Sequence, residues 1–349
     1  MSVAILGFGV VGSGFYNNAI KENIDIKYIY ARPEKNTPSG VVKTNNIDDI
    51  LNDKDVNIVV ETLGGLDFAY NMIKKCLMAK KNVVTANKEV VSIYIDELTS
   101  LAKQNNVFFL FEASVCGSVP IVKNLFEIRN HEEVVEIEAI TNGTTNYILT
   151  NMFFGSEFND VLNKAIEYGY AERNCDNDLL GLDSLRKITI MADIAYNTKL
   201  NLSDVLTYGI KNVTLDIIND VKNRGFILKS ISSIKKVGNS ICIKTIPTLL
   251  NPNHPLARTD DSYNRVIVKT KNNSYEYHGA GAGGNPTGAI ILEDVKLVMN
   301  NHNYNDYQNI NTLSINNIVN KYYVVDKNHN IKIVDKLEEE YLFVAEYLE

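Results

Sequence analysis

The sequence is poor in the features that mark membrane, secreted and nucleic-acid-binding proteins. It has only 4 cysteines in 349 residues and no C-x-x-C pair, which disfavours a disulfide framework or a zinc ribbon. No apolar run approaches the roughly 18 residues that a transmembrane helix needs. The formal net charge is −7 and no long basic run occurs, so we expect neither nucleic-acid nor membrane partners.

The N-terminal segment, MSVAILGFGVVGSGF, lacks a basic stretch before its apolar residues and therefore does not resemble a signal peptide. Scattered cysteines suit a reducing compartment, and we expect a cytoplasmic protein. Hydrophobic residues make up 45% and charged residues 22% of the chain, which is ordinary globular composition. At about 150 residues per domain, the length predicts two or three domains.

A glycine-rich turn follows the first predicted strand. Residues 2–6 are an apolar run, GFGVVG follows at residues 7–12, and a helical stretch comes next. In this context G-x-G-x-x-G predicts dinucleotide binding, because its glycines allow a tight turn, close approach of a pyrophosphate and close helix packing. The alternative is a purely structural turn. The predicted cofactor contacts here are Gly7, Phe8, Gly9, Val10, Val11 and Gly12.

Further strands alternate with helices. Apolar runs at residues 25–31, 56–61, 82–86 and 107–113 are separated by helical stretches. This alternation predicts an α/β fold, with a Rossmann-like parallel sheet and helices on both faces. TANK, at residues 85–88, follows a predicted strand, so Lys88 is expected at the sheet edge where such folds bind ligands. A surface lysine capping a turn is the alternative.

The second predicted strand ends at Ala31 and Arg32. An acidic residue there would hold the ribose 2′-hydroxyl of NAD(H), whereas an arginine suits a 2′-phosphate. We therefore expect a preference for NADP(H), with NAD(H) possible and Lys43 as a second cation. A solvated loop arginine is the alternative.

The pattern changes near Glu112, where a small-residue loop, EASVCGSVP, leads into long strands mixed with helices. We expect an α+β substrate and oligomerisation domain with a mixed open sheet at residues 131–285. The dinucleotide-binding domain would span 1–130 and be completed by a helix at about 286–300. Residues 301–349 are expected to form a C-terminal tail, to which we assign no role.

The stretch DLLGLDSLRK places Asp183 and Lys187 four residues apart on a predicted helix. An exposed pair at this spacing contributes only about 0.3–0.5 kcal/mol. Their face continues into Ile190 and Ile194, so we expect both side chains to point into a cleft rather than into solvent. Arg186, Thr189 and Asp193 are expected on a narrow polar strip.

Seven motifs in order give the chain a family resemblance. They are GFGVVG, ETLGG, TANK, EASVCGSVP, NGTTNYIL, GYAE–DLLGLD–LRK and GAGAGGNPTG, along roughly residues 1–300. On these motifs the chain resembles homoserine dehydrogenase. The resemblance implies NAD(P)H-dependent interconversion of L-aspartate 4-semialdehyde and L-homoserine in threonine and methionine biosynthesis, by a homodimer or homotetramer.

The resemblance also implies residue roles. Lys187 matches the catalytic proton donor, Lys88 a second lysine, and Asp183 an acid beside them. The implied substrate residues are Glu172, Asp178, Asp183, Gly143, Thr144 and Tyr170, and the further cofactor contacts are Leu63, Lys88, Gly169, Gly281 and Gly283. A monovalent cation, typically Na⁺, is implied at Glu112 and the carbonyls of Val115, Gly117 and Val119; hard oxygen ligands suit such an ion.

One loop departs from the family pattern. Arg173 and Cys175 stand where prolines are expected in AERNCDND, so two fixed φ angles are lost from a substrate loop. We also expect a form without an aspartate kinase part or a complete C-terminal ACT domain. Two other interpretations remain: another Rossmann oxidoreductase of a related substrate, and an inactive nucleotide-binding protein.

Overall fold

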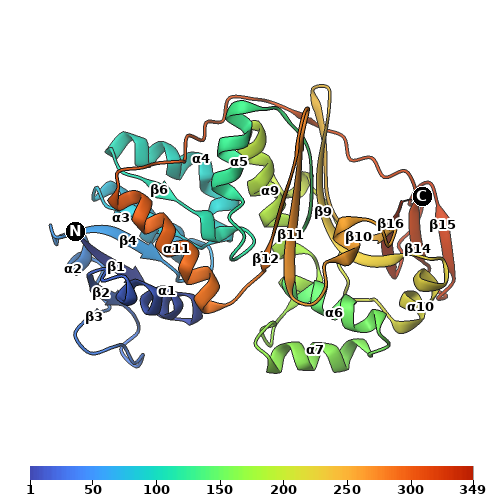
Figure 1. Ribbon diagram of the computed structural model, residues 1–349, viewed down its shortest axis with the longest axis horizontal. Helices are drawn as coiled ribbons and strands as arrows, with labels where there is room; N and C mark the ends of the chain where they lie inside the picture. Colours follow the sequence, from blue (N-terminus) through green and yellow to red (C-terminus); the bar gives the residue numbers. More distant parts are fainter. Residues whose placement is uncertain (349) are drawn as a thin grey trace. The chain divides into compact units, whose positions relative to one another are not determined.

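The computed structural model describes residues 1–348 and contains two compact units (Figure 1). The first unit comprises residues 1–131, 193–199 and 282–311, and the second comprises 132–192, 200–281 and 312–349. The fold-class prediction, a Rossmann-like parallel sheet plus an α+β part with a mixed sheet, is confirmed. Within residues 1–348, no helix combines the length and apolar character that crossing a bilayer requires.

The first unit is built on a six-stranded parallel sheet of order β3-β2-β1-β4-β5-β6. Its central strands are buried on both faces, which explains their continuous apolar sequences. From β1 the chain adds β2 and β3 on one side and β4, β5 and β6 on the other. Sheets of this kind bind ligands at the point where the strand order reverses. The strands are β1 (Ser2–Leu6), β2 (Ile26–Tyr30), β3 (Val42–Thr44), β4 (Val56–Glu61), β5 (Asn82–Thr85) and β6 (Phe109–Leu110).

Helices cover this sheet (Figure 1). They are α1 (Val10–Lys21), α2 (Asp48–Leu51), α3 (Asp67–Met78), α4 (Lys88–Asn105), α5 (Val122–His131) and α11 (Gly284–Met299). The strand expected at 107–113 is shorter than predicted, because the chain turns into a 3₁₀ helix at Glu112–Ser114 directly after β6.

Helices α1 and α11 lie side by side (Figure 1) because glycines line their contact. A Cβ on Gly14 would lie 2.0 Å from the carbonyl oxygen of Gly284, and one on Gly288 would lie 2.4 Å from the backbone of Gly14. No larger residue fits this approach without moving a backbone. The glycine-rich stretch near 280–288 therefore packs the late helix onto the first one.

The second unit is built on a mixed sheet with the path β12-β11-β7-β9-β10-β16-β14-β15, and with β8 and β13 also paired to β10. The tail contributes strands to this sheet, including the antiparallel hairpin of β14 and β15. The strands are β7 (Val134–Ile140), β8 (Leu206–Thr207), β9 (Ile227–Val237), β10 (Ser240–Leu250), β11 (Tyr263–Thr270), β12 (Ser274–Ala280), β13 (Ser314–Ile315), β14 (Tyr322–Val325), β15 (Ile331–Val334) and β16 (Phe343–Tyr347).

Helices α6 (Gly143–Phe153), α7 (Phe158–Glu167) and α10 (Leu215–Asn223) share one apolar core with this sheet. The core joins Ile148 and Met152 of α6 to Leu228 of β9 and Leu249 of β10. Two more helices, α8 (Asp176–Leu179) and α9 (Leu182–Tyr196), follow in the chain. This packing fixes the N-terminus of α6 at the end of β7, where the polar network described below begins.

Candidate active site

The predicted dinucleotide turn joins β1 to α1. Gly7 has φ +91°, and a Cβ there would lie 2.7 Å from the carbonyl oxygen of Thr62. A Cβ on Gly12 would lie 2.3 Å from the carbonyl oxygen of Gly7, so both positions require glycine. Gly9 is the N-cap of α1, and a Cβ there would meet open space. An open helix N-terminus is what a phosphate group needs.

The end of β2 presents a cation to solvent. The Arg32 side chain is 88% exposed, and its Nη1 lies 3.9 Å from Oε1 of Glu34, which is too far for a hydrogen bond. Lys43 of β3 donates to the carbonyl oxygens of Pro33, at 2.7 Å, and Lys35, at 3.3 Å. Lys43 thus holds the loop that follows Arg32, and the Arg32 guanidinium is a cation that a ligand can reach.

A buried carboxyl joins the ends of β4 and β5. Glu61 is fully buried; it accepts hydrogen bonds from Oγ1 of Thr85, at 2.5 Å, and from the backbone N–H of Leu63, at 2.7 Å. Burial raises the pKa of Glu61. Asn87 caps α4 by accepting from two backbone amides and donates to the carbonyl of Gly65. These contacts fix the start of α4, and therefore the backbone of Lys88, its first residue.

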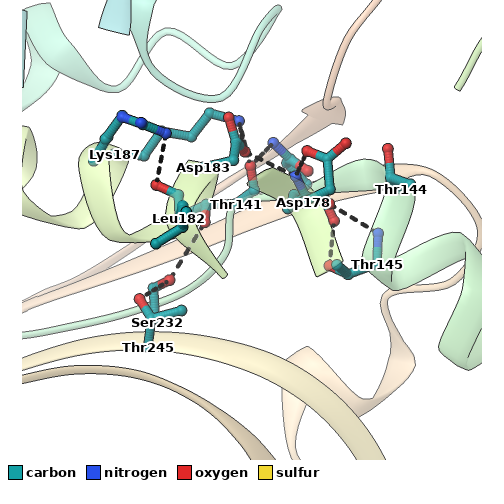
Figure 2. A network of polar contacts seen from close by, with 12 residues as sticks. Thr141, Thr144, Thr145, Asp178, Leu182, Asp183, Lys187, Ser232 and Thr245 are labelled. Carbon is teal, nitrogen blue, oxygen red and sulfur yellow. Dashed lines mark hydrogen bonds and ion pairs between the residues drawn. The ribbon is translucent and has the colours of Figure 1, made fainter. Parts of the chain in front are cut away.

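In the second unit, a lysine and two aspartates meet at the junction of β7 and α6 (Figure 2). Nζ of Lys187 lies 2.8 Å from Oδ2 of Asp183 and donates to the carbonyl oxygen of Thr141 at 2.7 Å. Asn142 donates through Nδ2 to Oδ2 of Asp183, at 2.8 Å, and to Oδ1 of Asp178, at 2.7 Å. Four side chains from β7–α6, α8 and α9 therefore form one connected network.

Burial separates this pair from an ordinary surface ion pair. Asp183 is 2% exposed and Lys187 is 7% exposed. Two charges are held out of water only if their geometry and hydrogen bonds are good, and here each charge has at least two polar contacts within 2.8 Å. The helix break at Gly181, with φ +81°, allows Asp178 on α8 and Asp183 on α9 to turn toward the same asparagine.

The expected polar strip on α9 is not a solvent-exposed strip. Thr189 and Asp193 are fully buried, and Arg186 is half-buried. Thr189 satisfies its hydroxyl by donating to the carbonyl oxygen of Leu185, and Asp193 pairs with Lys199 at 3.1 Å. Local partners thus allow polar residues on every face of this helix to be buried.

Three of the other predicted substrate residues, Gly143, Thr144 and Tyr170, lie at the start of α6 or contact it. Gly143 is its first residue, and a Cβ there would lie 2.6 Å from the carbonyl oxygen of Ser262. Thr144 donates to the carbonyl oxygen of Tyr170 at 2.5 Å, which ties α6 to the loop after α7. In that loop Gly169 has φ +75°. Glu172 is exposed, and its side chain takes no part in the Asp183–Lys187 network of the described residues.

The last two predicted cofactor glycines, Gly281 and Gly283, lie where a larger residue would clash or be strained. In the first unit, Gly283 has φ +126° and precedes α11. In the second unit, a Cβ on Gly281 would lie 2.4 Å from Oδ1 of the buried Asn264. Asn264 in turn donates to the carbonyl oxygen of Thr141 at 3.0 Å, the same oxygen that Lys187 contacts.

The predicted cation loop contains a buried acid. Glu112 is 4% exposed, and its carboxylate accepts from the backbone amides of Val122, at 2.8 Å, and Lys123, at 2.6 Å. Burial raises the pKa of Glu112 to about 7. Asp294 accepts from the Glu112 backbone amide at 3.0 Å, and burial raises its pKa as well. Two neighbouring buried acids make this loop electrostatically suited to a cation.

Sequence reasoning missed Asn142 and Glu61, although both lie inside quoted motifs. Asn142 stands at the end of a predicted strand, immediately before a helix, where an asparagine is normally interpreted only as an N-cap. Glu61 ends a strand as a charged residue at the ligand-binding edge of the sheet, and that position was the available signal.

The first unit has the sheet and glycine turn of nicotinamide-dinucleotide enzymes, and the second holds a buried lysine–carboxylate network suited to proton transfer. Together these are the parts of a nicotinamide-dependent oxidoreductase. Residues 7–112 match the family model described as "Homoserine dehydrogenase, NAD binding domain", and residues 120–295 match the model described as "Homoserine dehydrogenase". The chain therefore belongs to the homoserine dehydrogenase family.

Similar proteins support the same family. The homoserine dehydrogenase of Bacillus subtilis is 33% identical over 317 residues, covering 86% of this chain and 73% of that relative. That of Lactococcus lactis is 30% identical, covering 93% of this chain and 82% of the relative. The crystal structure of a homoserine dehydrogenase from Thiobacillus denitrificans superposes with a TM-score of 0.87 at 28% identity, covering 93% of this chain and 82% of that one.

Proposed function

We propose that this chain catalyses the reversible NAD(P)H-dependent reduction of L-aspartate 4-semialdehyde to L-homoserine, a step of threonine and methionine biosynthesis. The observation that carries the proposal is the buried network of Lys187, Asp183, Asn142 and Asp178. The proposal assigns cofactor binding mainly to the first unit, and substrate binding with proton transfer to the second.

Lys187 is the proposed proton donor. When bound, the nicotinamide supplies the hydride for reduction and accepts it for oxidation. Reduction of an aldehyde leaves negative charge on its oxygen, which the Lys187 ammonium stabilises before giving up a proton. In the oxidation direction the neutral amine accepts that proton. Asp183 orients the ammonium through their 2.8 Å contact. Lys88 is proposed as a second lysine serving the nicotinamide and the substrate.

The amino acid group of the substrate carries a positive α-ammonium and a negative carboxylate, so its binding site needs a partner for each charge. The α-ammonium is proposed to bind the carboxylates of Asp178 and Glu172, which attract a cation at neutral pH. The start of α6 at Gly143 and Thr144 supplies backbone N–H groups that suit the substrate carboxylate. The Thr144 bond to the Tyr170 carbonyl, at 2.5 Å, holds the Tyr170 loop against α6.

Arg32 is proposed to select NADP(H) over NAD(H). Its side chain is 88% exposed, and Lys43, which donates to two backbone carbonyls of the following loop, is proposed as a second cation. A guanidinium offers paired donors to the 2′-phosphate oxygens, whereas NAD(H) has only a hydroxyl there.

A monovalent cation, Na⁺ in the simplest case, is proposed at Glu112 and the carbonyls of Val115, Gly117 and Val119. The donor set fits, because one carboxylate and three carbonyls are hard oxygen ligands. These four residues are buried in the described structure, and burial raises the pKa of Glu112 to about 7, because it disfavours the charged carboxylate. A bound ion would favour the charged form of Glu112 and hold the loop that leads into α5.

Turnover of L-homoserine with NADP⁺, followed by the absorbance of reduced cofactor, tests the proposal. Oxidation of homoserine but not of glycerol or L-serine supports it. Another oxidoreductase would prefer a different substrate, and an inactive nucleotide-binding protein would bind cofactor without turnover. An aspartate-semialdehyde dehydrogenase is disfavoured because it needs a nucleophilic cysteine paired with histidine; Cys175, the cysteine nearest this network in sequence, has its pKa raised by burial.

A further inference from the structure

The junction between β7 and α6 contains a side chain that the proposed mechanism has not yet used. Asn142 is 5% exposed, and both ends of its amide are engaged. Its Oδ1 accepts from the backbone N–H of Thr145 at 2.8 Å and thereby caps α6. Its Nδ2 donates to Asp178 and Asp183.

The orientation of this amide is determined by its partners. Backbone N–H groups only donate, so the atom that faces Thr145 must be the oxygen. The nitrogen then faces the two carboxylates, and both of its hydrogens are used. The reversed amide would place an oxygen against two acids and a nitrogen against a donor, losing three hydrogen bonds.

We propose that Asn142 is a positioning residue that holds Asp178 and Asp183 in place and so sets the geometry of Lys187; this inference rests on the proposed function. Asp178 lies on α8 and Asp183 on α9, on either side of the turn at Gly181. A single amide donating to both fixes their separation and lessens the repulsion between two like charges.

The neighbouring residue completes the arrangement. The carbonyl oxygen of Thr141 accepts from Nζ of Lys187 at 2.7 Å, and Asn264 donates to the same oxygen at 3.0 Å. The Thr141 hydroxyl is 3.3 Å from that of Ser232, which contacts Thr245 at 3.0 Å (Figure 2). One dipeptide, Thr141–Asn142, therefore contacts all three charged members of the network and is anchored to β9 and β10.

Two substitutions separate the capping of α6 by Asn142 from the hydrogen bonds that Asn142 donates to Asp178 and Asp183. Asn142→Ser and Asn142→Asp both keep an oxygen that can cap α6, because serine and aspartate are good N-caps. Asn142→Ser removes both donated bonds to the acids. Asn142→Asp replaces the donor by a carboxyl, which repels Asp178 and Asp183 when ionised and donates one hydrogen bond when protonated.

The measurement is kcat/KM for homoserine oxidation between pH 6 and 9, with a thermal melt and a cofactor fluorescence titration of each variant. A hydrogen bond to a charged group corresponds to roughly 10–100-fold, so Asn142→Ser should lose about that factor at every pH. Asn142→Asp should lose more at pH 9, and its activity relative to the parent protein should recover toward pH 6. Both should bind cofactor normally.

Thr214→Ala is the matched control. Thr214 caps α10 by accepting from the backbone N–H of Ile217, at 3.4 Å, and the control should lower the melting temperature without changing the pH profile. If Asn142 only caps α6, its two variants, which keep a capping oxygen, will show the kcat/KM and pH profile of the parent protein, and the inference is wrong. A Lys187→Ala enzyme that is inactive beside active Asn142 variants would overturn the inference and leave the proposed function intact.

A second measurement does not depend on the substrate. A double-mutant cycle of Asn142→Ser and Asp178→Asn compares the melting temperatures of the two single variants and the double variant. A bridging amide predicts shifts that are clearly smaller in the double variant than the sum of the single shifts. Additive shifts would contradict the inference even if homoserine proved not to be the substrate.

Discussion

Replacing Asp183 by asparagine changes the charge of the buried pair while keeping its shape. Oδ2 of Asp183 accepts from both Lys187 and Asn142, and an amide oxygen in the same place can accept from both. The negative charge is lost, and an NH2 group takes the place of Oδ1. At 2.8 Å the attraction between the pair is about 6 kcal/mol with an effective dielectric constant near 20. The carboxylate also costs several kcal/mol to bury, so we expect Asp183→Asn to lower the free energy of unfolding by about 3 kcal/mol.

The same substitution should lower kcat for homoserine oxidation by roughly 10²-fold or more, since the lysine loses the charge that orients it. Urea unfolding and steady-state kinetics measure the two effects. Asp220→Asn is the control, because Asp220 pairs with Arg224 at the same i,i+4 spacing but in a partly exposed position. It should cost under about 1 kcal/mol and leave kcat unchanged. An Asp183→Asn enzyme that matches this control in both measurements would refute the reasoning.

Three further predictions concern other sites. Arg32→Ala should weaken NADP(H) binding by about 1–3 kcal/mol in fluorescence titration and spare NAD(H); equal losses would contradict a role in reading the phosphate. Na⁺ at about ten times its Kd should raise the free energy of unfolding of the parent protein by about 1.4 kcal/mol, compared with choline at equal ionic strength. Glu112→Gln should abolish this increase. Burial lowers the pKa of Lys229 to about 8, so between about pH 8 and 10.5 the unfolded chain binds more protons and stability should rise, by about 3 kcal/mol in all. Lys229→Met should remove that rise in urea unfolding, and an unchanged slope would count against it.

Most of the first unit could be predicted from its sequence, since its strands are buried on both faces and therefore appear as uninterrupted apolar runs. The need for glycine at residues 7 and 12 has a steric cause, because a side chain at either position would clash with neighbouring backbone. The short strand β3 was not predicted, since its three residues give no periodicity. In the second unit, the long hairpin of β9 and β10 has a recognisable pattern, but the addition of tail strands to this sheet depends on pairing between distant segments.

The candidate site was predictable in part. The helix face carrying Asp183 and Lys187 could be recognised as buried because it continues into isoleucines. The burial of Thr189 and Asp193 did not follow from the polar strip, since Thr189 satisfies its hydroxyl on the helix backbone and Asp193 pairs with Lys199, beyond the end of the helix. The bridging role of Asn142 was also invisible, because its two acids come from segments 36 and 41 residues away in the chain.

The central claim is that Lys187 transfers the proton during homoserine oxidation. The most direct test is kcat for Lys187→Ala with saturating homoserine and NADP⁺, beside Arg224→Ala, which removes the cation of the partly exposed i,i+4 pair. We predict that kcat falls by roughly 10²–10⁴-fold for Lys187→Ala, with cofactor binding intact, and stays unchanged for Arg224→Ala. A Lys187→Ala enzyme with near-normal kcat would contradict the account and would direct attention to Lys88.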